Sequence, residues 1–521
     1  MVSLAPCESV LAGRQYPFYK PPEKRPSPAS VRAAEARLLD LLGPGAVSAS
    51  EIERVAVSRD FWPMGQTWFL QGKMAAIPDL VVWPRTTDEV AATLRVAQEF
   101  DVPVTPFGEG SGALGGAIPV AGGILLDLKK MNRFLHIDRE NYLATVEAGL
   151  NGRIYEDTLA AAGFTGGHIP QSLPCSTIGG WLACRAAGQF STRYGKIEDL
   201  VTGITAVLPD GRVLSNRIAP RTATGPQVWP LFLGSEGTLG VITEATLRVF
   251  PVPEKRVFAS YAFSSVESGL DAIKRALHRG ARPAVVRLYD DLETGRHFAN
   301  VSAAEGKCLL VLIVEGDSRL VAAEEEILAE ECRAAGAVGC GSEPVETWRR
   351  ARFDISISSQ LFRRGAIADT IEVAGGWDRI AAIYRAMSQE VGELEGTLVA
   401  SGHFSHVYPD GACLYLSIAG FPPGEPAEYH QAVWEKAMDA VLRHGGTISH
   451  HHGIGFHRAP FLARERGEAD LDALRLIKKA WDPKGILNPG KLGLDERGPA
   501  GPVGPAGTST DGPAAEVKSR V

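Results

Sequence analysis

Residues 106–116, Pro-Phe-Gly-Glu-Gly-Ser-Gly-Ala-Leu-Gly-Gly, are the stretch of this sequence that most clearly suggests chemistry. Five of these eleven residues are glycine, and the stretch directly follows the apolar run Val102–Thr105. Glycine has no Cβ, so such a loop can turn its backbone N–H groups toward a diphosphate. The stretch has neither the Lys-Ser/Thr pair of a P-loop nor the regular phase of a G-x-G-x-x-G turn. It therefore predicts a dinucleotide site of another kind.

A second candidate is the run His450, His451 and His452, which precedes Gly-Ile-Gly. Imidazoles exchange protons near neutral pH, so the run indicates acid–base chemistry; the alternatives are a surface run or a metal site. Neighbouring side chains diverge in a strand or helix, so we expect only one or two of the three to face a common ligand.

Two isolated polar residues stand in strand-like apolar runs. Tyr415 ends the run Gly-Ala-Cys-Leu-Tyr and offers a phenol for proton transfer, although alternation alone would place it in a core. Arg287, in Ala-Val-Val-Arg-Leu-Tyr-Asp, needs an anionic partner on such a strand. That partner is either a ligand or one of the nearby acids, Asp290 and Asp291.

The elements that must position these residues follow two patterns. Around the glycine-rich stretch the pattern is β-α-β, which predicts an α/β unit in which Gly123–Asp127 and Tyr142–Glu147 pair as strands. Its other predicted elements are an extended arm over 1–30, strands Leu80–Val82 and Val102–Thr105, and helices Val31–Leu42, Thr87–Phe100 and Ile154–Ala162. Later in the chain we expect an α+β cap, with strands Val257–Phe263, Ala284–Leu288, Cys308–Glu315 and Ala412–Ile418 and helices Val266–His278, 318–335, Trp377–Glu393 and Pro426–His444.

The composition restricts the classes of function. The 521 residues suffice for two domains, and a net charge of −7 disfavours nucleic acid or an anionic membrane as the main partner. The seven cysteines show no C-x-x-C spacing, which indicates free thiols and a reducing, cytoplasmic location. We expect neither a signal peptide nor an integral membrane segment. Beyond residue 494, glycine at three-residue spacing with proline predicts a disordered tail over 495–521.

Four stretches occur in the order typical of one protein family: the glycine-rich stretch 106–116, SLPCSTIGGWLACRAAG at 172–188, GSEGTLGVIT at 234–243 and SHHHGIG at 449–455. DPKGILNPGKLG at 482–493 completes the pattern. Together they resemble the vanillyl-alcohol-oxidase/p-cresol-methylhydroxylase flavoproteins over residues 80–493. The triple histidine and YPDGACLY at 408–415 are most similar to the branch of alkylglycerone-phosphate synthase and its bacterial relatives.

The resemblance implies an α+β fold with a two-subdomain FAD-binding domain of the p-cresol-methylhydroxylase type and an α+β cap domain that carries an antiparallel sheet. The implied division is an N-terminal arm with helices at 1–75, the FAD-binding domain at 76–252, the substrate or cap domain at 253–444, and a segment at 445–494 that returns to the FAD site. Because members of the family are often dimeric, a homodimer is also among the expectations.

The implied cofactor is FAD, held non-covalently, since the glycine-rich stretch contains no His or Cys for a covalent link. His168 and Cys175 lie near the second of the four stretches. The cofactor-binding residues implied by the matching stretches are Pro106, Phe107, Gly108, Glu109, Gly110, Ser111, Gly112, Ser172, Ser176, Thr177, Gly179, Gly180, Arg185, Ala186, Ala187, Gly188, Glu236, Gly237, Thr238, Leu239, Gly240, Val241 and Ile242.

The resemblance also implies catalytic roles for Tyr415, Arg287 and the residues His450, His451 and His452. Related dehydrogenases carry metal ligands in the corresponding segments. Here Tyr415 and His451 stand where a His and a Glu would be, leaving His406, and without the carboxylate we expect no metal.

The substrate-binding pattern departs from the resembled branch at one position. An arginine that binds substrate there lies nineteen residues before the Trp-Asp-Arg of 377–379, and counting back reaches Ser358. Serine is a poor replacement for a bidentate guanidinium, so Arg352, Arg363 or Arg364 would have to compensate. We take Ser358, Arg352 and His406 as candidate substrate contacts.

Three functions follow as hypotheses. The first is an FAD-dependent oxidoreductase, a dehydrogenase or oxidase that acts on a small hydroxylated organic substrate. The second is alkylglycerone-phosphate synthase itself, an ether-lipid enzyme that uses FAD without net redox change. The third is a flavoprotein retained for binding alone, which the presence of Tyr415, Arg287 and the histidine run disfavours.

Overall fold

The computed structural model describes residues 8–11, 19, 22, 25–354 and 356–495. The predicted arm at 1–30 and tail at 495–521 therefore lie largely outside the described residues. Where the arm is described, residues 28–30 already belong to a helix, because Ser27 caps its N-terminus and Pro28 fits the first turn. Among the described helices, none combines the length and apolar character that a membrane crossing requires. All six described cysteines are free thiols.

The glycine-rich stretch belongs to a small, mostly parallel sheet in which β5, β6 and β4 run parallel and β2 is antiparallel. All four residues of β6 are buried, as expected for a strand covered on both faces. Helix α4 is capped by Thr86 and packs beside α1. The bounds are β2 (Val47–Ser48), β4 (Leu80–Val82), β5 (Val104–Phe107), β6 (Ile124–Asp127), α1 (Pro28–Leu42), α2 (Glu51–Ala56), α3 (Pro63–Leu70) and α4 (Thr87–Phe100).

A second, antiparallel sheet has the strand order β11-β10-β12-β8-β7. The predicted pairing of Gly123–Asp127 with Tyr142–Glu147 is wrong, because β6 lies in the parallel sheet while β8 pairs with β7 and β12 here. The bounds are β7 (Phe134–Asp138), β8 (Leu143–Glu147), β10 (Val201–Val207), β11 (Val213–Ser215), β12 (Val241–Arg248), α5 (Gly152–Ala161), α6 (Ile178–Cys184), α7 (Ser191–Tyr194) and α8 (Ile197–Leu200). Two short pairs are β1 (Glu8–Ser9) with β3 (Lys73–Met74), and β9 (Phe164–Thr165) with β13 (Phe250–Pro251).

The cap contains the predicted antiparallel sheet, with seven strands in the order β17-β14-β16-β15-β19-β20-β18. Its bounds are β14 (Lys255–Phe263), β15 (Val285–Tyr289), β16 (Cys308–Gly316), β17 (Val338–Gly339), β18 (Ile367–Gly376), β19 (Thr397–Tyr408) and β20 (Gly411–Gly420). The helices are α9 (Val266–His278), α10 (Asp291–His297), α11 (Ser318–Ala334), α12 (Glu343–Ala351), α13 (Ser356–Arg363), α14 (Ile380–Gly392) and α15 (Pro426–Arg443).

Alternation along these strands gives the seven-stranded sheet two unlike faces. Leu288, Phe404 and Leu414 are fully buried and belong to one hydrophobic core with residues of α9, α11, α14 and α15. Their sequence neighbours Arg287, His403 and Tyr415 point to the opposite face. Helix α7, from the half that carries the glycine-rich stretch, contacts β15 and β19. The polar face of the cap is therefore the one that meets the rest of the molecule.

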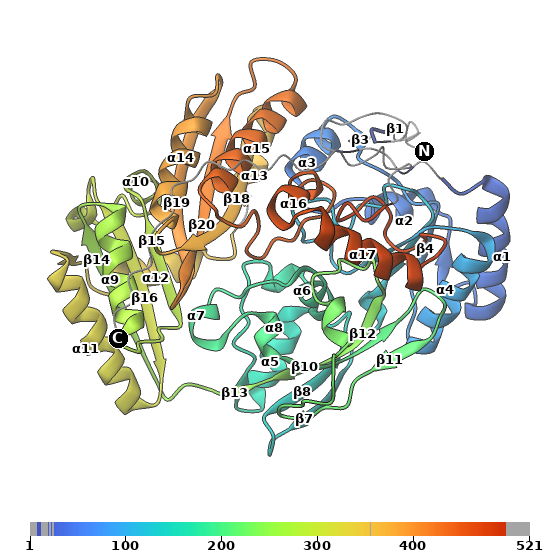
Figure 1. The fold of residues 1–521 in the computed structure, drawn as a ribbon, viewed down its shortest axis with the longest axis horizontal. Helices are drawn as coiled ribbons and strands as arrows, with labels where there is room; N and C mark the ends of the chain where they lie inside the picture. The colour runs from blue at the N-terminus through green and yellow to red at the C-terminus, as the bar shows by residue number, and fades with distance from the viewer. Residues whose placement is uncertain (1–7, 12–18, 20–21, 23–24, 355, 496–521) are drawn as a thin grey trace, which may run out of the picture.

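The C-terminal segment, drawn in red in Figure 1, lies between the two halves and contains α16 (Ala459–Arg466) and α17 (Glu468–Trp481). After α17 it joins the edge of the parallel sheet, where the Asn488 N–H donates to the Val104 carbonyl at 2.8 Å. The Asn488 side chain donates to the carbonyls of Gly116 at 3.0 Å and Glu236 at 2.6 Å. One late segment thus closes around the glycine-rich stretch, as the sequence pattern predicted.

Candidate functional site

The loop after β5 offers a row of free amide donors. Pro106 and Phe107 belong to β5 itself, so the loop starts at Gly108. In the described part of the chain, the N–H groups of residues 108–112 donate no hydrogen bond. Gly110 adopts φ 65°, a conformation that only glycine takes without strain. Successive N–H donors without a partner suit the anionic oxygens of a diphosphate, so the residues of this loop fit the predicted FAD.

Two other predicted cofactor segments approach this loop closely. A Cβ on Gly108 would collide with the Thr177 hydroxyl, and one on Gly116 would lie 2.9 Å from the Glu236 carboxylate. Thr177 also caps α6 by accepting from the Gly180 N–H at 3.3 Å. The three segments chosen from the sequence are therefore in mutual contact.

Several predicted cofactor residues have structural duties in the fold. Ser176 accepts from the Trp181 indole at 2.8 Å, and Val241 and Ile242 are buried in β12. Glu236 accepts from the Ile454 and Gly455 amides at 2.6 and 2.8 Å, so its carboxylate is used by the C-terminal segment. Close packing surrounds Gly179, Gly188 and Gly240. Glu109 accepts from the Asn151 amide at 2.9 Å, and Arg185 pairs with Glu198 at 3.3 Å. The other members of the set lie in the same three segments: Ser111, Gly112, Ser172, Ala186, Ala187, Gly237, Thr238 and Leu239.

The second part of the site is built by strand register on the polar face of the cap sheet. His403 on β19 pairs directly with Tyr415 on β20, and Tyr415 pairs with Glu372 on β18. The His403 and Tyr415 rings stack with centroids 4.8 Å apart. Arg287 reaches the same face from β15, opposite Ser405.

Arg287 contacts neither of the acids that the sequence suggested. It donates to the Tyr289 hydroxyl at 2.9 Å and to His403 Nε2 at 2.6 Å. Because Nε2 accepts, His403 carries its hydrogen on Nδ1 and donates it to Glu293 at 2.8 Å. Asp290 is occupied elsewhere, since it caps α10 and accepts from the Tyr384 hydroxyl.

The histidine run lies in a bend that wraps around one buried carboxylate. Glu372 accepts from the backbone N–H groups of His450, His451 and His452 at 2.5, 3.3 and 2.8 Å. The fully buried Arg458 donates to the same carboxylate at 2.6 Å. Burial raises the pKa of Glu372, but Arg458 and then His452 outweigh burial and lower it to about 2. The carboxylate is therefore ionised and fixes the bend.

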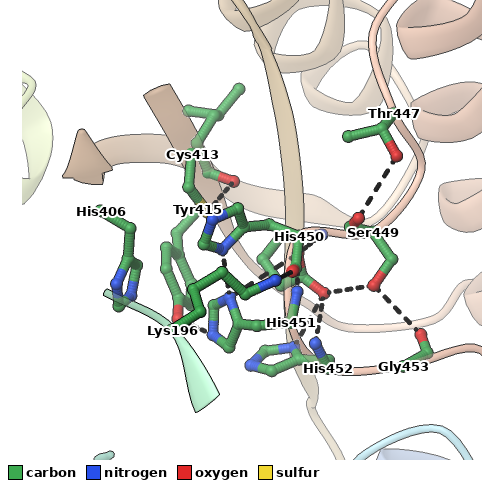
Figure 2. A network of polar contacts seen from close by, with 12 residues as sticks. Lys196, His406, Cys413, Tyr415, Thr447, Ser449, His450, His451, His452 and Gly453 are labelled. Carbon is green, nitrogen blue, oxygen red and sulfur yellow. Dashed lines mark hydrogen bonds and ion pairs between the residues drawn. The ribbon is translucent and has the colours of Figure 1, made fainter. Parts of the chain in front are cut away.

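Because the run is neither strand nor helix, its three side chains gather on one side. His450, His451 and His452 cluster beside Tyr415 (Figure 2). That only one or two of them face a common ligand stays a prediction. Tyr415 makes a short hydrogen bond with His451 Nε2. The two Nδ1 atoms of His450 and His451 are 2.9 Å apart.

His406 joins this cluster through a β-bulge. The register of β19 against β20 shifts between Ser405 and Val407, and the intervening His406 has φ 49°. A left-handed conformation in a residue other than glycine costs about 1 kcal/mol and turns the side chain from the face that alternation would assign. The His406 ring lies 4.9 Å from His451 and 6.2 Å from Tyr415 between centroids, and its Nδ1 is 2.8 Å from the Ser191 hydroxyl.

Burial keeps the titratable groups of this cluster neutral. It lowers the pKa of His450 to about 3, with Lys196 adding to the effect, and lowers the pKa values of His451 and His406 well below the usual range, with neighbouring histidines adding to it. Burial likewise raises the pKa of Tyr415 well above its usual range, with Cys413 adding to the effect. At neutral pH these are neutral imidazoles and a neutral phenol.

Cys413, His450 and His451 also have potential metal-ligating atoms within 4.8 Å of one another. In the described structure, however, His450 and His451 use their ring nitrogens in hydrogen bonds. Burial raises the pKa of the Cys413 thiol well above its usual range, which disfavours the thiolate that binds metals. The group is therefore described as a hydrogen-bonded cluster.

The candidate substrate residues differ from one another in burial and in how fully the structure describes them. Ser358 lies in α13, among residues whose side chains are outside the described set, while Arg363 and Arg364 are exposed. Arg352 is half-buried against the rings of Phe190, Trp348 and Phe353. It has no hydrogen bond or ion pair in the described part of the chain, and burial followed by Arg349 lowers its pKa to about 10.

Six further residues complete the cluster but were not singled out from the sequence: Ser191, Lys196, Glu372, His403, Tyr408 and Arg458. Glu372 had a usable signal, because it is a lone acid in the apolar run Thr-Ile-Glu-Val-Ala, as Arg287 is a lone base in its own run. Tyr408 opens the family motif at 408–415 but was not itself singled out, and Ser191 had no signal, since serine is ordinary in such a position.

Comparison with known proteins identifies the family of the chain. Residues 78–216 match the family model described as FAD binding domain, and residues 252–492 match FAD linked oxidases, C-terminal domain. The chain is 34% identical over 433 residues to an FAD-linked oxidoreductase named YgcU from Escherichia coli O157:H7, covering 80% of this chain and 89% of the relative. It is 32% identical to alkyldihydroxyacetonephosphate synthase of Trypanosoma brucei brucei, covering 83% of this chain and 75% of that protein.

Among solved structures, an alkyldihydroxyacetonephosphate synthase superposes with a TM-score of 0.75 at 25% identity, covering 91% of this chain and 89% of that one. p-Cresol methylhydroxylase superposes with a TM-score of 0.72 at 18% identity, covering 90% of this chain and 98% of that one, and thus shares the fold. The chain belongs to the FAD-linked oxidase family of flavoenzymes, with the vanillyl-alcohol-oxidase/p-cresol-methylhydroxylase fold.

Proposed function

We propose that this flavoenzyme oxidises a small hydroxylated organic substrate whose hydroxyl proton is accepted at Tyr415. One observation carries the proposal. The loop at 449–455 places His451 on the Tyr415 hydroxyl and, three and four residues later, places the amides of Ile454 and Gly455 on Glu236 beside the glycine-rich loop. The proton-accepting pair is thereby tied to the cofactor cradle.

The chain's own residues hold FAD through backbone contacts in this proposal. The free amides of residues 108–112 bind the diphosphate, with Thr177 and Gly180 forming the adjoining wall. FAD, when bound, supplies the acceptor for a hydride from the substrate carbon. We infer non-covalent attachment, because residues 108–112 include no His or Cys and because burial, then Glu109, raises the pKa of the Cys175 thiol.

Tyr415 and His451 act together on the substrate hydroxyl. The phenol donates its hydrogen to His451 Nε2, which leaves oxygen lone pairs free to accept the substrate proton. Transfer along this bond means that no free phenolate has to form in a site where burial opposes one. Arg287 fixes His403 against the Tyr415 ring and so holds the phenol in place.

In the described part of the chain the half-buried Arg352 guanidinium makes no hydrogen bond or ion pair, although Glu315 contributes a favourable charge. Such an arginine supports a substrate that carries a carboxylate or phosphate. In this proposal Arg352 takes the place of the arginine missing at Ser358. The free thiols support a reducing, cytoplasmic location.

Anaerobic mixing of the FAD-loaded enzyme with a panel of 2-hydroxy acids and alcohols tests the reaction. A substrate should bleach the flavin absorbance, and Tyr415→Phe should slow bleaching about 100-fold or more with flavin content unchanged. Tyr142→Phe, on an exposed tyrosine, is the matched control and should be neutral. Acid precipitation should leave the flavin in the supernatant.

The second candidate is the alkyl transfer of the synthase relatives, which the 32% identity to the trypanosomal enzyme favours. Formation of an ether lipid from acyl-dihydroxyacetone phosphate and a fatty alcohol, with no electron acceptor consumed, would replace the oxidoreductase proposal. Arg352→Gln should weaken binding of either anionic substrate about tenfold or more, raising KM more than it lowers kcat. The neighbouring exposed Arg350→Gln is the control.

A further inference from the structure

We propose that the hydrogen bonds leading from Tyr415 form a proton relay that passes through Ser191 of the FAD-binding half and ends at His406 on β19 of the cap. The inference rests on the proposed function, because it assigns the route taken by the proton that Tyr415 accepts. The members of the relay, in order, are Tyr415, His451, His450, Tyr408, Ser191 and His406.

Every link is within hydrogen-bonding distance. After the short Tyr415–His451 contact, His451 Nδ1 and His450 Nδ1 are 2.9 Å apart. His450 Nε2 and the Tyr408 hydroxyl are 3.1 Å apart, and Tyr408 donates to the Ser191 hydroxyl at 3.2 Å. Ser191 lies 2.8 Å from His406 Nδ1. Ser191 belongs to α7, so the last two links join the cap to the FAD-binding half.

The hydrogens of these groups can satisfy every link in only one sense. Tyr408 gives its single hydrogen to Ser191, so His450 must donate from Nε2 and accept at Nδ1. His451 then donates from Nδ1 and accepts from Tyr415 at Nε2. The Ser191 hydrogen has no described acceptor other than His406 Nδ1. The hydrogens of all five links thus point along the relay from Tyr415 toward His406, which is the direction in which a proton accepted at Tyr415 must move.

Burial makes an unbroken relay necessary. Because the pKa values of His450, His451 and His406 are all lowered, a proton cannot rest on any of these imidazoles at neutral pH. A proton that enters at the Tyr415 oxygen therefore shifts one hydrogen along each link, and His406 Nδ1 gains one. His406 is only 3% exposed. It gives up its other hydrogen, from Nε2, which contacts no acceptor in the described residues, to a water molecule that must enter the site. One proton enters and one leaves, and no redox step is involved.

The β-bulge is the feature that aims His406 into the relay. In a regular β19 strand, alternation would place residue 406 on the face opposite His403. The left-handed turn at φ 49° brings its ring to the Tyr415 side, facing Ser191. Strain of this kind persists where the surrounding structure requires it, and here it completes the final link.

Histidine tautomers test the relay without substrate or turnover. In ¹⁵N NMR of histidine-labelled enzyme near pH 7, we expect His451 to carry hydrogen on Nδ1, and His450 and His406 on Nε2, all three neutral. Single His→Gln variants assign the signals, and Ser191→Ala should shift the His406 Nδ1 signal. A reversed tautomer or an imidazolium at any of these positions overturns the relay, even if a hydroxylated substrate does bleach the flavin.

Kinetics provide the second test once a substrate has been found. Ser191→Ala and Tyr408→Phe should each slow bleaching about tenfold and alter the solvent deuterium isotope effect. Neither substitution should slow flavin bleaching further in the Tyr415→Phe background. Without the Tyr415 hydroxyl no proton enters the relay, so the later links no longer affect the rate. Ser405→Ala is the matched control, since its buried hydroxyl beside His406 has no partner. Equal slowing by Ser405→Ala, or additive effects with Tyr415→Phe, would overturn the relay; absence of any substrate would instead count against the proposed function.

Discussion

The loop at 108–112 and the loop at 449–453 both contain glycine, yet the first presents its backbone and the second its side chains. In the first loop the backbone N–H groups donate no hydrogen bond in the described part of the chain, so the proposed contact with FAD needs no side chain. In the second, the N–H groups of residues 450–452 all donate to Glu372, so the proposed chemistry falls to the imidazoles. A backbone site needs only the absence of Cβ atoms, whereas a side-chain site needs a buried group that fixes the loop first.

The strongest way to break the second loop is to neutralise its anchor with Glu372→Gln. The change leaves the fully buried Arg458 without its counter-charge, and we expect a loss of about 3–5 kcal/mol in unfolding free energy. Chemical denaturation and the melting temperature measure it. Asp40→Asn, in the exposed Arg37–Asp40 pair, is the control and should change stability by less than about 1 kcal/mol. A fully stable Glu372→Gln protein would show that the bend does not depend on this carboxylate.

In the first loop, a change that affects only the backbone conformation, Gly110→Ala, should be enough to weaken FAD binding. An added Cβ would meet the Arg59 carbonyl at 2.8 Å, in a φ 65° conformation that disfavours any side chain. With about 1–2 kcal/mol of strain, we expect FAD to bind about tenfold more weakly in a flavin titration. Gly295→Ala, where no atom lies within 4 Å, is the matched control. Undiminished affinity in Gly110→Ala would mean that this loop does not hold the cofactor.

Of the two loops, only the histidine loop should make the unfolding free energy depend on pH. The substitution His450→Gln should remove the part that comes from His450. Native His450 stays neutral down to about pH 3, while the unfolded side chain takes up a proton below its ordinary pKa of 6.5. Its contribution to stability is therefore complete above 6.5 and declines as the pH falls toward 3, by about 1.4 kcal/mol per pH unit. Between about pH 6 and pH 4, the wild type should lose about 2 kcal/mol more than His450→Gln.

Unfolding free energies at the two pH values measure this difference, with the exposed His444→Gln as the matched control. Parallel losses in the wild type and His450→Gln would show that His450 is not held neutral by burial.

Local patterns were sufficient for most individual elements. Helix α9 was predicted over Val266–His278 and has those bounds, because its apolar face is regular and Ser265 caps it. The helix predicted from Trp377 begins only at Ile380, since β18 continues to Gly376 and a turn follows it. Strand pairing was harder to predict. The sequences of β6 and β8 are both strand-like, but which strands they pair with depends on the rest of each sheet.

The same division holds at the site. Arg287, Tyr415 and the histidine run could be chosen because their types stand out against apolar surroundings or family motifs. His403 could not, because its role comes from lying opposite Tyr415 across two strands. Nor could the contact of Ser191 with Tyr408 and His406, which joins residues more than two hundred positions apart.

The sequence by itself determined the glycine-rich loop, the class of cofactor and the residue types available for proton transfer, because these depend on local composition and motif order. Only the tertiary structure decided which polar groups meet. Strand register aligned Glu372, Tyr415 and His403, a bulge turned His406 toward them, and a buried carboxylate gathered three consecutive histidines. These contacts depend on long-range strand pairing and on burial, and neither can be predicted from the residues next to each position in the chain.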